Sequence, residues 1–297
     1  MDAPERVPQV RQSSGEVGLQ EQERLSYLAV LDLIHRTLLP RTYLDIGVQN
    51  GHSLALALDC TRCVGVDPAP NVLVPLPPAT RIERCTSDEF FERERDSTPF
   101  GERGVDLVFI DGLHLFEYAL RDFANSEAMG HESTIIVIDD CLPRSREEAS
   151  RERMGVGWTG DVWKVLYYLR EKRPDLGLTV IHAPPTGLAI VRGLDPQRSL
   201  WLGDPGSLVA RYGDLDYECL RRDLLPTLSS ISAETAQVLA LLPPTSWQTG
   251  FDVDLLIDSR AARRPSLSTR ARRLRRRLSR SSFGQRLRGF HRGGAPR

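Results

Sequence analysis

The sequence predicts a doubly wound α/β fold, in which a mostly parallel sheet with an antiparallel final strand carries helices on both faces. Short β-rich runs alternate with helical patterns through residues 42–192. Two of these runs, VDLVFI at 105–110 and STIIVI at 133–138, are almost continuously apolar. Such runs are typical of parallel strands that helices cover from both sides. A length of 297 residues suffices for one such domain with appendages.

The first predicted element is a helix. Residues 21–39 carry apolar side chains at helical spacing, and Pro40 ends the run. The strands predicted after it are 42–46, 63–66, 80–83, 105–110, 134–138, 178–181 and 188–191, and the helices are 53–58, 88–95, 115–129 and 162–172. The turn at 184–187 is too short for a helical crossover, so we expect the last two strands to pair antiparallel.

Composition divides the chain into four segments. Residues 1–19 are polar and lack periodicity, which predicts a disordered leader, and residues 20–195 form the α/β domain with its N-terminal helix. The apolar stretches within residues 196–258 predict helical additions or a contact in a homo-oligomer. Residues 259–297 hold fourteen arginines and no acidic residue. This tail is either a solvated, disordered run or an amphipathic segment that contacts a membrane surface or an anionic partner.

Charge and cysteine usage narrow the function classes. Residues 1–258 hold 25 basic and 40 acidic residues, so this part of the chain is strongly acidic. An acidic body repels phosphate backbones, and no nucleic-acid substrate is expected for the α/β domain. The chain has no long apolar span, its first residues lack the order of a signal peptide, and its five cysteines lack regular spacing. We therefore expect a cytoplasmic protein.

The first chemical motif is YLDIGVQNG at 43–51. Its strand ends at Asp45 and Gly47, and Gly51 opens the next element, so these three residues are candidates for cofactor binding. Glycines allow a sharp turn and the close approach of a nucleotide-like ligand, and the following Asp67 can accept both hydroxyls of a ribose. Dinucleotides and S-adenosylmethionine both fit this pattern. The loop lacks the second close glycine of a dinucleotide fingerprint.

The second motif is a set of carboxylates. Asp111 ends the strand in VDLVFIDGLH, and Asp139 and Asp140 end the strand in TIIVIDDC. The carboxyl ends of parallel strands meet at one edge of a sheet, so these side chains should converge beside the glycine loop. Three hard oxygen donors suit Mg²⁺, Mn²⁺ or Ca²⁺. The alternative is that Asp139 and Asp140 only turn the chain after the strand.

FIDGLH and VIDDC together with the glycine loop resemble the class I S-adenosylmethionine-dependent methyltransferases. Within that class they resemble the metal-dependent group that contains macrolide-sugar O-methyltransferases and cephalosporin-hydroxylase-like proteins. The resemblance covers about residues 42–192 and implies a Rossmann-like methyltransferase sheet, an S-adenosylmethionine site, and Mg²⁺ bound by Asp111, Asp139 and Asp140. It also implies that His114, three residues after Asp111, is the base.

A metal ion and an imidazole can together activate a hydroxyl for methyl transfer to its oxygen. A divalent cation lowers the pKa of a bound hydroxyl, and His114, oriented by Asp111, takes the proton. The expected acceptor is a hydroxyl of a small molecule or glycan, and a sugar is favoured over a catechol. The alternatives are a non-methylating, hydroxylase-like binding protein on the same fold, an NAD-dependent oxidoreductase, and a His114 that only makes a local hydrogen bond.

Three further features leave alternatives open. Ser87 and Asp88 follow the third strand, where they either contact the adenine of the cofactor or cap a helix. Two tryptophans in WTGDVWK at 158–164 suggest a lid or acceptor wall, although Trp163 fits a helix core better. Cys60 and Cys63 have the spacing of half a zinc site, but no second close pair accompanies them.

Overall fold

The computed structural model describes residues 24–95, 97, 99–155, 157–198 and 205–242. The chain divides into two compact units, Met1–Thr249 and Gly250–Arg297. The second unit lies wholly outside the described residues, as do the predicted leader at 1–19 and the arginine-rich tail at 259–297. The fold below is therefore that of the first unit.

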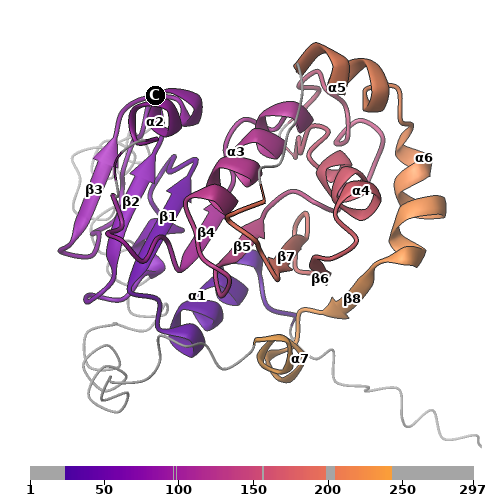
Figure 1. Cartoon of the computed structure of the whole chain (residues 1–297). Coiled ribbons are helices and arrows are strands. Elements are labelled where there is room, and N and C mark those ends of the chain that lie inside the picture. The colour runs from indigo at the N-terminus through magenta and orange to yellow at the C-terminus, as the bar shows by residue number, and fades with distance from the viewer. Residues whose placement is uncertain (1–23, 96, 98, 156, 199–204, 243–297) are drawn as a thin grey trace, which may run out of the picture. The chain divides into compact units, whose positions relative to one another are not determined.

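One mixed sheet forms the centre of this unit, with the described strands in the order β3-β2-β1-β4-β5-β7-β6-β8 (Figure 1). The strands are β1 (Thr42–Ile46), β2 (Arg62–Val66), β3 (Thr80–Glu83), β4 (Leu107–Ile110), β5 (Ile135–Ile138), β6 (Gly177–His182), β7 (Leu188–Arg192) and β8 (Ser229–Ser232). β7 is antiparallel to both of its neighbours, and the other pairs are parallel. The predicted antiparallel pairing of 178–181 with 188–191 is confirmed.

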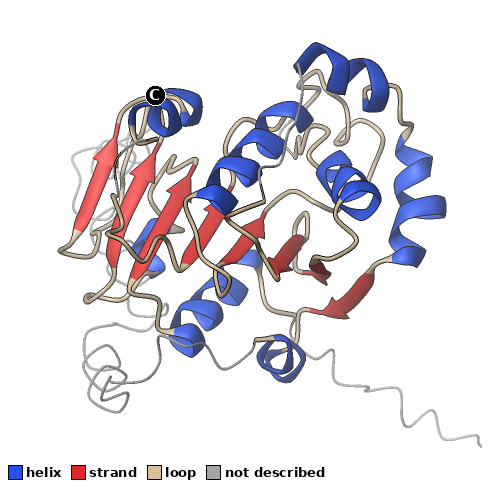
Figure 2. Ribbon diagram, viewed as in Figure 1, coloured by secondary structure: helices blue, strands red, loops and turns tan. Residues whose placement is uncertain are grey.

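Helices cover both faces of the sheet (Figure 2). The helices are α1 (Tyr27–Leu38), α2 (Ser87–Arg93), α3 (Phe116–Ala128), α4 (Trp163–Lys172), α5 (Pro205–Tyr212), α6 (Tyr217–Cys219) and α7 (Thr235–Leu241), with short turns η1 (Leu54–Leu56), η2 (Leu220–Leu224) and η3 (Leu225–Thr227). Side chains of α2, α3, α4 and α5 share one apolar core. Side chains of α1, η1 and α7 share the core on the opposite face. The predicted doubly wound architecture is confirmed.

Local sequence explains where the key elements begin and end. All residues of β4 and β5 are buried, because helices pack on both of their faces. Ser26 caps α1 by accepting the Ala29 N–H, and Leu39 ends it in the left-handed conformation directly before Pro40. The predicted helix at 21–39 is thus shorter in the structure, in which residues 21–23 are not described.

Two elements differ from the sequence-based prediction. The helix predicted at 53–58 is only the single turn η1, because the chain must return to the sheet within a few residues. Residues 196–258, predicted as helical additions, also contain the strand β8, which pairs in parallel with the edge strand β6. A short serine-rich run shows no strand pattern of its own. Its pairing with an open sheet edge depends on a tertiary neighbour, which the local sequence does not reveal. Within the described residues no helix has the length and apolar character needed to cross a bilayer.

Candidate active site

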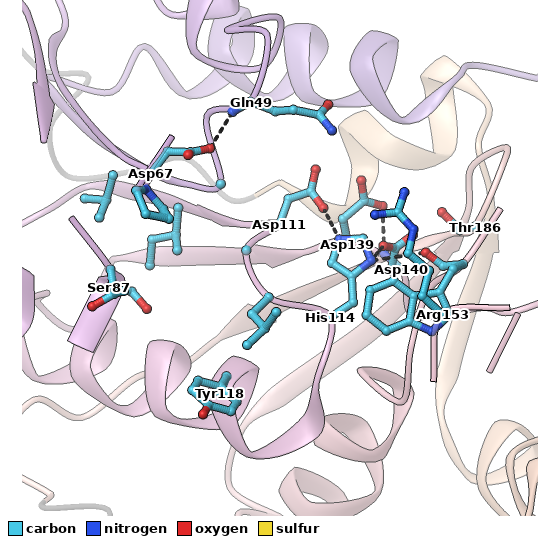
Figure 3. Close-up of a pocket in the computed structure, with 18 of the residues that line it drawn as sticks. Gln49, Asp67, Ser87, Asp111, His114, Tyr118, Asp139, Asp140, Arg153 and Thr186 are labelled. Carbon is cyan, nitrogen blue, oxygen red and sulfur yellow. Dashed lines mark hydrogen bonds and ion pairs between the residues drawn. The ribbon is translucent and has the colours of Figure 1, made fainter. Parts of the chain in front are cut away.

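A cavity of about 620 Å³ opens at the carboxyl ends of β1, β2, β4 and β5. Asp67 and Ser87 lie on one side of it, and His114, Asp140 and Thr186 lie on the other (Figure 3). The parallel pairing of β2, β1, β4 and β5 directs all four strand ends to this edge. The convergence predicted from the motifs is therefore present.

The glycine loop after β1 turns through left-handed backbone at Gly47, Gln49 and Gly51, with φ of 94°, 43° and 77°. Gly47 lines the cavity, whereas Gly51 does not. Asp45 was predicted to contact the cofactor, but it is completely buried below the loop. Its carboxylate accepts the Ser53 hydroxyl at 2.6 Å, so Asp45 supports the loop from inside. Burial raises the pKa of Asp45 to about 7.

Asp67 stands at the end of β2 and lines the cavity as predicted. Its two carboxylate oxygens accept the backbone N–H groups of Gln49 at 2.8 Å and Ala69 at 2.7 Å. These bonds fix the carboxylate beside the glycine loop. Each oxygen keeps a lone pair for a ribose hydroxyl.

Ser87 and Asp88 line the same half of the cavity. The cap of α2 is neither of them, because Thr86 accepts the Glu89 N–H and the Glu89 carboxylate accepts the Thr86 N–H. The capping alternative for Ser87 and Asp88 was therefore wrong. Asp88 pairs with Arg121 of α3, and the Ser87 side chain hydrogen-bonds the buried carboxylate of Asp122.

An acidic cluster with His114 at its centre forms the other half of the cavity. His114 Nε2 lies 3.3 Å from Asp111 Oδ1, and Nδ1 lies 2.9 Å from Asp140 Oδ2. Asp111, His114 and Asp140 form the only metal-capable group among the described residues, with one ligand atom from each within 4.8 Å of the others. Asp139, predicted as a third ligand, lies outside this group and accepts the Asp140 N–H at 2.8 Å.

The charges of this cluster perturb one another. Burial raises the pKa of Asp111 to about 6, although hydrogen bonding to His114 opposes the shift. Burial and the carboxylates of Asp111 and Asp140 raise the pKa of Asp139 well above its ordinary value. Burial alone would lower the pKa of His114, but its bonds to Asp111 and Asp140 raise it to about 10. The imidazole is thus protonated at neutral pH and supplies the positive charge of the site.

This donor set fits a hard divalent cation. The carboxylates of Asp111 and Asp140 converge from the ends of β4 and β5 beside the His114 imidazole, and water and a ligand oxygen can complete the coordination. Burial raises the pKa of Asp111 and of Asp139, so a bound cation would favour the charged forms of both carboxylates. Asp111 and Asp140 would hold the cation, and its charge would lower the pKa of a bound hydroxyl.

The loop between β5 and α4 closes the far wall of the cavity. The Trp158 ring stacks on His114, with centroids 5.2 Å apart and planes 19° apart. Thr159 ties the loop back on itself by donating its N–H and hydroxyl to the Glu148 carbonyl. The acceptor-wall prediction thus fits Trp158, whereas Trp163 is 1% exposed and belongs to the core.

Three cavity residues were not singled out by the sequence. Tyr27 reaches the cavity from the first turn of α1, Tyr118 from α3, and Arg153 from the loop between β5 and α4. Burial and the carboxylates of Asp139, Asp111, Asp140 and Asp45 raise the pKa of Tyr27 well above its usual value. The Tyr27 phenol therefore stays protonated beside the acidic cluster. None of the three belongs to a local motif.

Residues 44–141 match the family model of a methyltransferase domain. This third of the chain is similar to a methyltransferase domain, in agreement with the resemblance to class I methyltransferases. Enzymes of this class use S-adenosylmethionine as the methyl donor, and the match covers the glycine loop and all three aspartates of the acidic cluster. The match favours a methyltransferase over the NAD-dependent alternative, and the sheet order with its antiparallel β7 agrees with the methyltransferase fold.

Several solved structures resemble this methyltransferase domain at low identity. The O-methyltransferase TomG from Streptomyces achromogenes, involved in tomaymycin synthesis and solved in complex with SAM, is 15% identical over 56% of this chain and 78% of its own, with a TM-score of 0.43. An O-methyltransferase from Bacillus cereus in complex with SAH is 14% identical over 54% of this chain and 77% of its own, with a TM-score of 0.40. No curated protein matches the chain.

Proposed function

We propose that this protein is a Mg²⁺-dependent O-methyltransferase that transfers a methyl group from S-adenosylmethionine to a hydroxyl of a small molecule or glycan, with a sugar favoured. One observation carries the proposal. The cavity that holds Asp67 beside the glycine loop also holds the cluster of Asp111, His114 and Asp140. A donor site and a hydroxyl-activating site thus share one cavity.

The donor half fits the adenosine part of S-adenosylmethionine. Asp67 is fixed by two backbone N–H groups and can accept the ribose hydroxyls, in keeping with its position at the end of β2. Ser87 and Tyr118 line the region beyond it, where a flat base can lie against the Tyr118 ring. Gly47, which the same cavity exposes, leaves room for the amino-acid end of the donor beside the acidic cluster.

In the proposed reaction the acceptor oxygen attacks the methyl carbon in line with the sulfonium. A carbon–oxygen bond forms, the carbon–sulfur bond breaks, and S-adenosylhomocysteine and the hydroxyl proton are the other products. A bound divalent cation lowers the pKa of a hydroxyl. The task of His114 is to accept the released proton.

His114 can accept that proton only when it is neutral. Asp111 and Asp140 raise the pKa of His114 to about 10, so the imidazole keeps its proton at pH 7 while it alone compensates the two carboxylates. Positive charge supplied between these carboxylates would remove the reason for the shift. The proposal therefore couples the base function of His114 to cation binding.

The test is methyl transfer from radiolabelled S-adenosylmethionine to a panel of sugars and catechols, with and without chelator. We expect chelation to abolish transfer, Mg²⁺ to restore it, and S-adenosylhomocysteine to bind in both conditions. His114→Ala should lower kcat by about 10²–10⁴. The matched control is Glu132→Gln, which changes an exposed carboxylate away from the cavity. Full activity in chelator would refute the metal-dependent mechanism.

A further inference from the structure

Arg153 differs in charge from the rest of the cavity wall. Among the described residues that line the cavity, five are aspartates, and Arg153 is the only lysine or arginine. Its side chain is exposed, and within the described part of the chain it forms no ion pair. Its one recorded partner is the Trp158 ring, with the guanidinium carbon 5.8 Å from the ring centroid. An unpaired guanidinium therefore faces an acidic site.

The loop that carries Arg153 is fixed on both sides of it. Before it, Arg151 forms ion pairs with Glu117 at 2.8 Å and with the fully buried carboxylate of Asp161 at 2.6 Å. After it, the Trp158 indole N–H donates to the Ser150 carbonyl oxygen. These anchors hold Arg153 at the rim of the cavity and apart from the three carboxylates of the cluster. Its charge is available to a bound molecule.

Arg153 lies on the acceptor side of the cavity. Figure 3 places it with His114 and Thr186, away from Asp67 and Ser87. The Trp158 ring contacts both His114 and Arg153, so the guanidinium lies within one small-molecule length of the imidazole. A single acceptor can reach both groups.

Resting on the proposed function, we propose that the acceptor is anionic, with a carboxylate or phosphate bound by Arg153 while its hydroxyl lies at His114. Carboxylates and phosphates match the planar fork of a guanidinium, which binds them through two parallel hydrogen bonds. The anionic group also compensates the Arg153 charge, which no described residue pairs. A neutral sugar or catechol leaves that charge without a partner.

The test measures binding by titration calorimetry to the full chain saturated with S-adenosylhomocysteine and Mg²⁺. Glucose is compared with glucuronate and with glucose 6-phosphate, and catechol is compared with 3,4-dihydroxybenzoate. We expect at least one anionic probe to bind about tenfold tighter than its neutral partner. The glucuronate and glucose 6-phosphate arms separate a carboxylate from a phosphate ligand.

Three variants test whether Arg153 causes the preference for anionic probes over neutral ones. Arg153→Gln should reduce the preference to less than about threefold, Arg153→Lys should keep part of it, and Arg146→Gln should keep all of it. Arg146 is an exposed arginine of the same loop that pairs with Asp216 outside the cavity. These comparisons are made at the same Mg²⁺ concentration, so direct binding of the anion to the cation cancels.

Two results would overturn the inference. One is equal binding, or no binding, of the anionic and neutral members of both probe sets. The other is an unchanged preference in Arg153→Gln, or an effect of this substitution on S-adenosylhomocysteine binding alone, which would assign Arg153 to the donor. Failure of the proposed function gives a different result, since S-adenosylhomocysteine would then not bind to the unaltered protein.

Discussion

The backbone of Gly47 lies directly against that of Asp111. A Cβ atom on Gly47 would stand 1.9 Å from the Asp111 carbonyl oxygen, and the Asp111 N–H donates to the carbonyl of Ile46 at 2.8 Å. The glycine was predicted as a means of approach to a nucleotide. In the structure it also brings the strand end that carries the acidic cluster against the donor loop, and thereby joins the two halves of the site.

Gly47→Ala should disrupt both halves at once. The new Cβ meets backbone rather than a flexible side chain, and φ of 94° is strained for alanine. We expect a lower melting temperature, corresponding to at least about 2 kcal/mol, and loss of S-adenosylhomocysteine binding. Gly101→Ala is the control, since Gly101 has a similar φ of 78° but open space around it. Equal effects of the two substitutions would contradict the role of the Asp111 contact.

Asp67→Ala should weaken S-adenosylhomocysteine binding by about ten- to a hundredfold, because a paired hydrogen bond to the ribose is lost. Calorimetry measures the affinity, and thermal unfolding reports whether the loss of the bonds to Gln49 and Ala69 destabilises the fold. Asp214→Asn, an exposed carboxylate outside the cavity, should leave both values unchanged. Unchanged affinity in Asp67→Ala would assign the ribose contact to another residue.

The three aspartates of the cluster should differ in their effect on the metal requirement. Asp111→Asn and Asp140→Asn each remove a member of the converging group and should raise the Mg²⁺ concentration for half-maximal activity by about tenfold or more. Asp139→Asn should raise it less, because Asp139 lies outside that group. The measurement is activity against Mg²⁺ concentration for each variant. The largest effect in Asp139→Asn would show that Asp139 is a direct ligand.

Tyr27→Phe should lower kcat with little change in fold stability. Tyr27 lines the cavity next to four carboxylates, and its raised pKa keeps the phenol as a hydrogen-bond donor. Loss of a donor that positions the reactants is expected to cost about tenfold in rate. Tyr167→Phe, on α4 and outside the cavity, serves as the control. Equal kcat in Tyr27→Phe and the unaltered protein would leave Tyr27 with a packing role.

Asp122 should make the stability of the protein depend on pH. It is 2% exposed on α3, and burial raises its pKa from 3.8 to about 7. Between these values the unfolded chain has lost the proton that the folded protein keeps, so stability falls as pH rises from about 4 to 7. The slope amounts to at most about 1.4 kcal/mol per pH unit for this group.

Chemical unfolding at several pH values measures that slope. Asp122→Asn removes the ionisable group and should flatten the fall between pH 4 and 7. Asp216→Asn, in an exposed ion pair, should leave the slope nearly unchanged. A fall of the same size in Asp122→Asn would assign the pH dependence to other buried carboxylates, of which Asp45 is the first candidate.

The sequence alone determined the order of the strands along the chain, the doubly wound class and the convergence of the two motifs. Apolar runs such as LVFI and IIVI at 107–110 and 135–138 report burial on both faces. Asp67, Asp111 and Asp139 stand directly after strands, Asp140 follows Asp139, and parallel pairing brings strand ends to one edge. These properties follow from the local periodicity of apolar residues and from the rule that parallel strands end at the same edge of a sheet. Both can be applied to a single sequence.

Only the tertiary structure decided which side chains complete the site. Along the chain, Tyr27 precedes the glycine loop and Arg153 follows the acidic motifs. Both enter the cavity because α1 and the loop before α4 pack over the same strand ends. Asp45 is buried below the loop and does not line the cavity. Asp139 lines the cavity but lies outside the metal-capable group, although both residues stand in the expected motifs. The direction of a side chain at a strand end depends on backbone angles and neighbours, such as the φ of 60° at Asp140, and these arise from packing between segments distant in sequence.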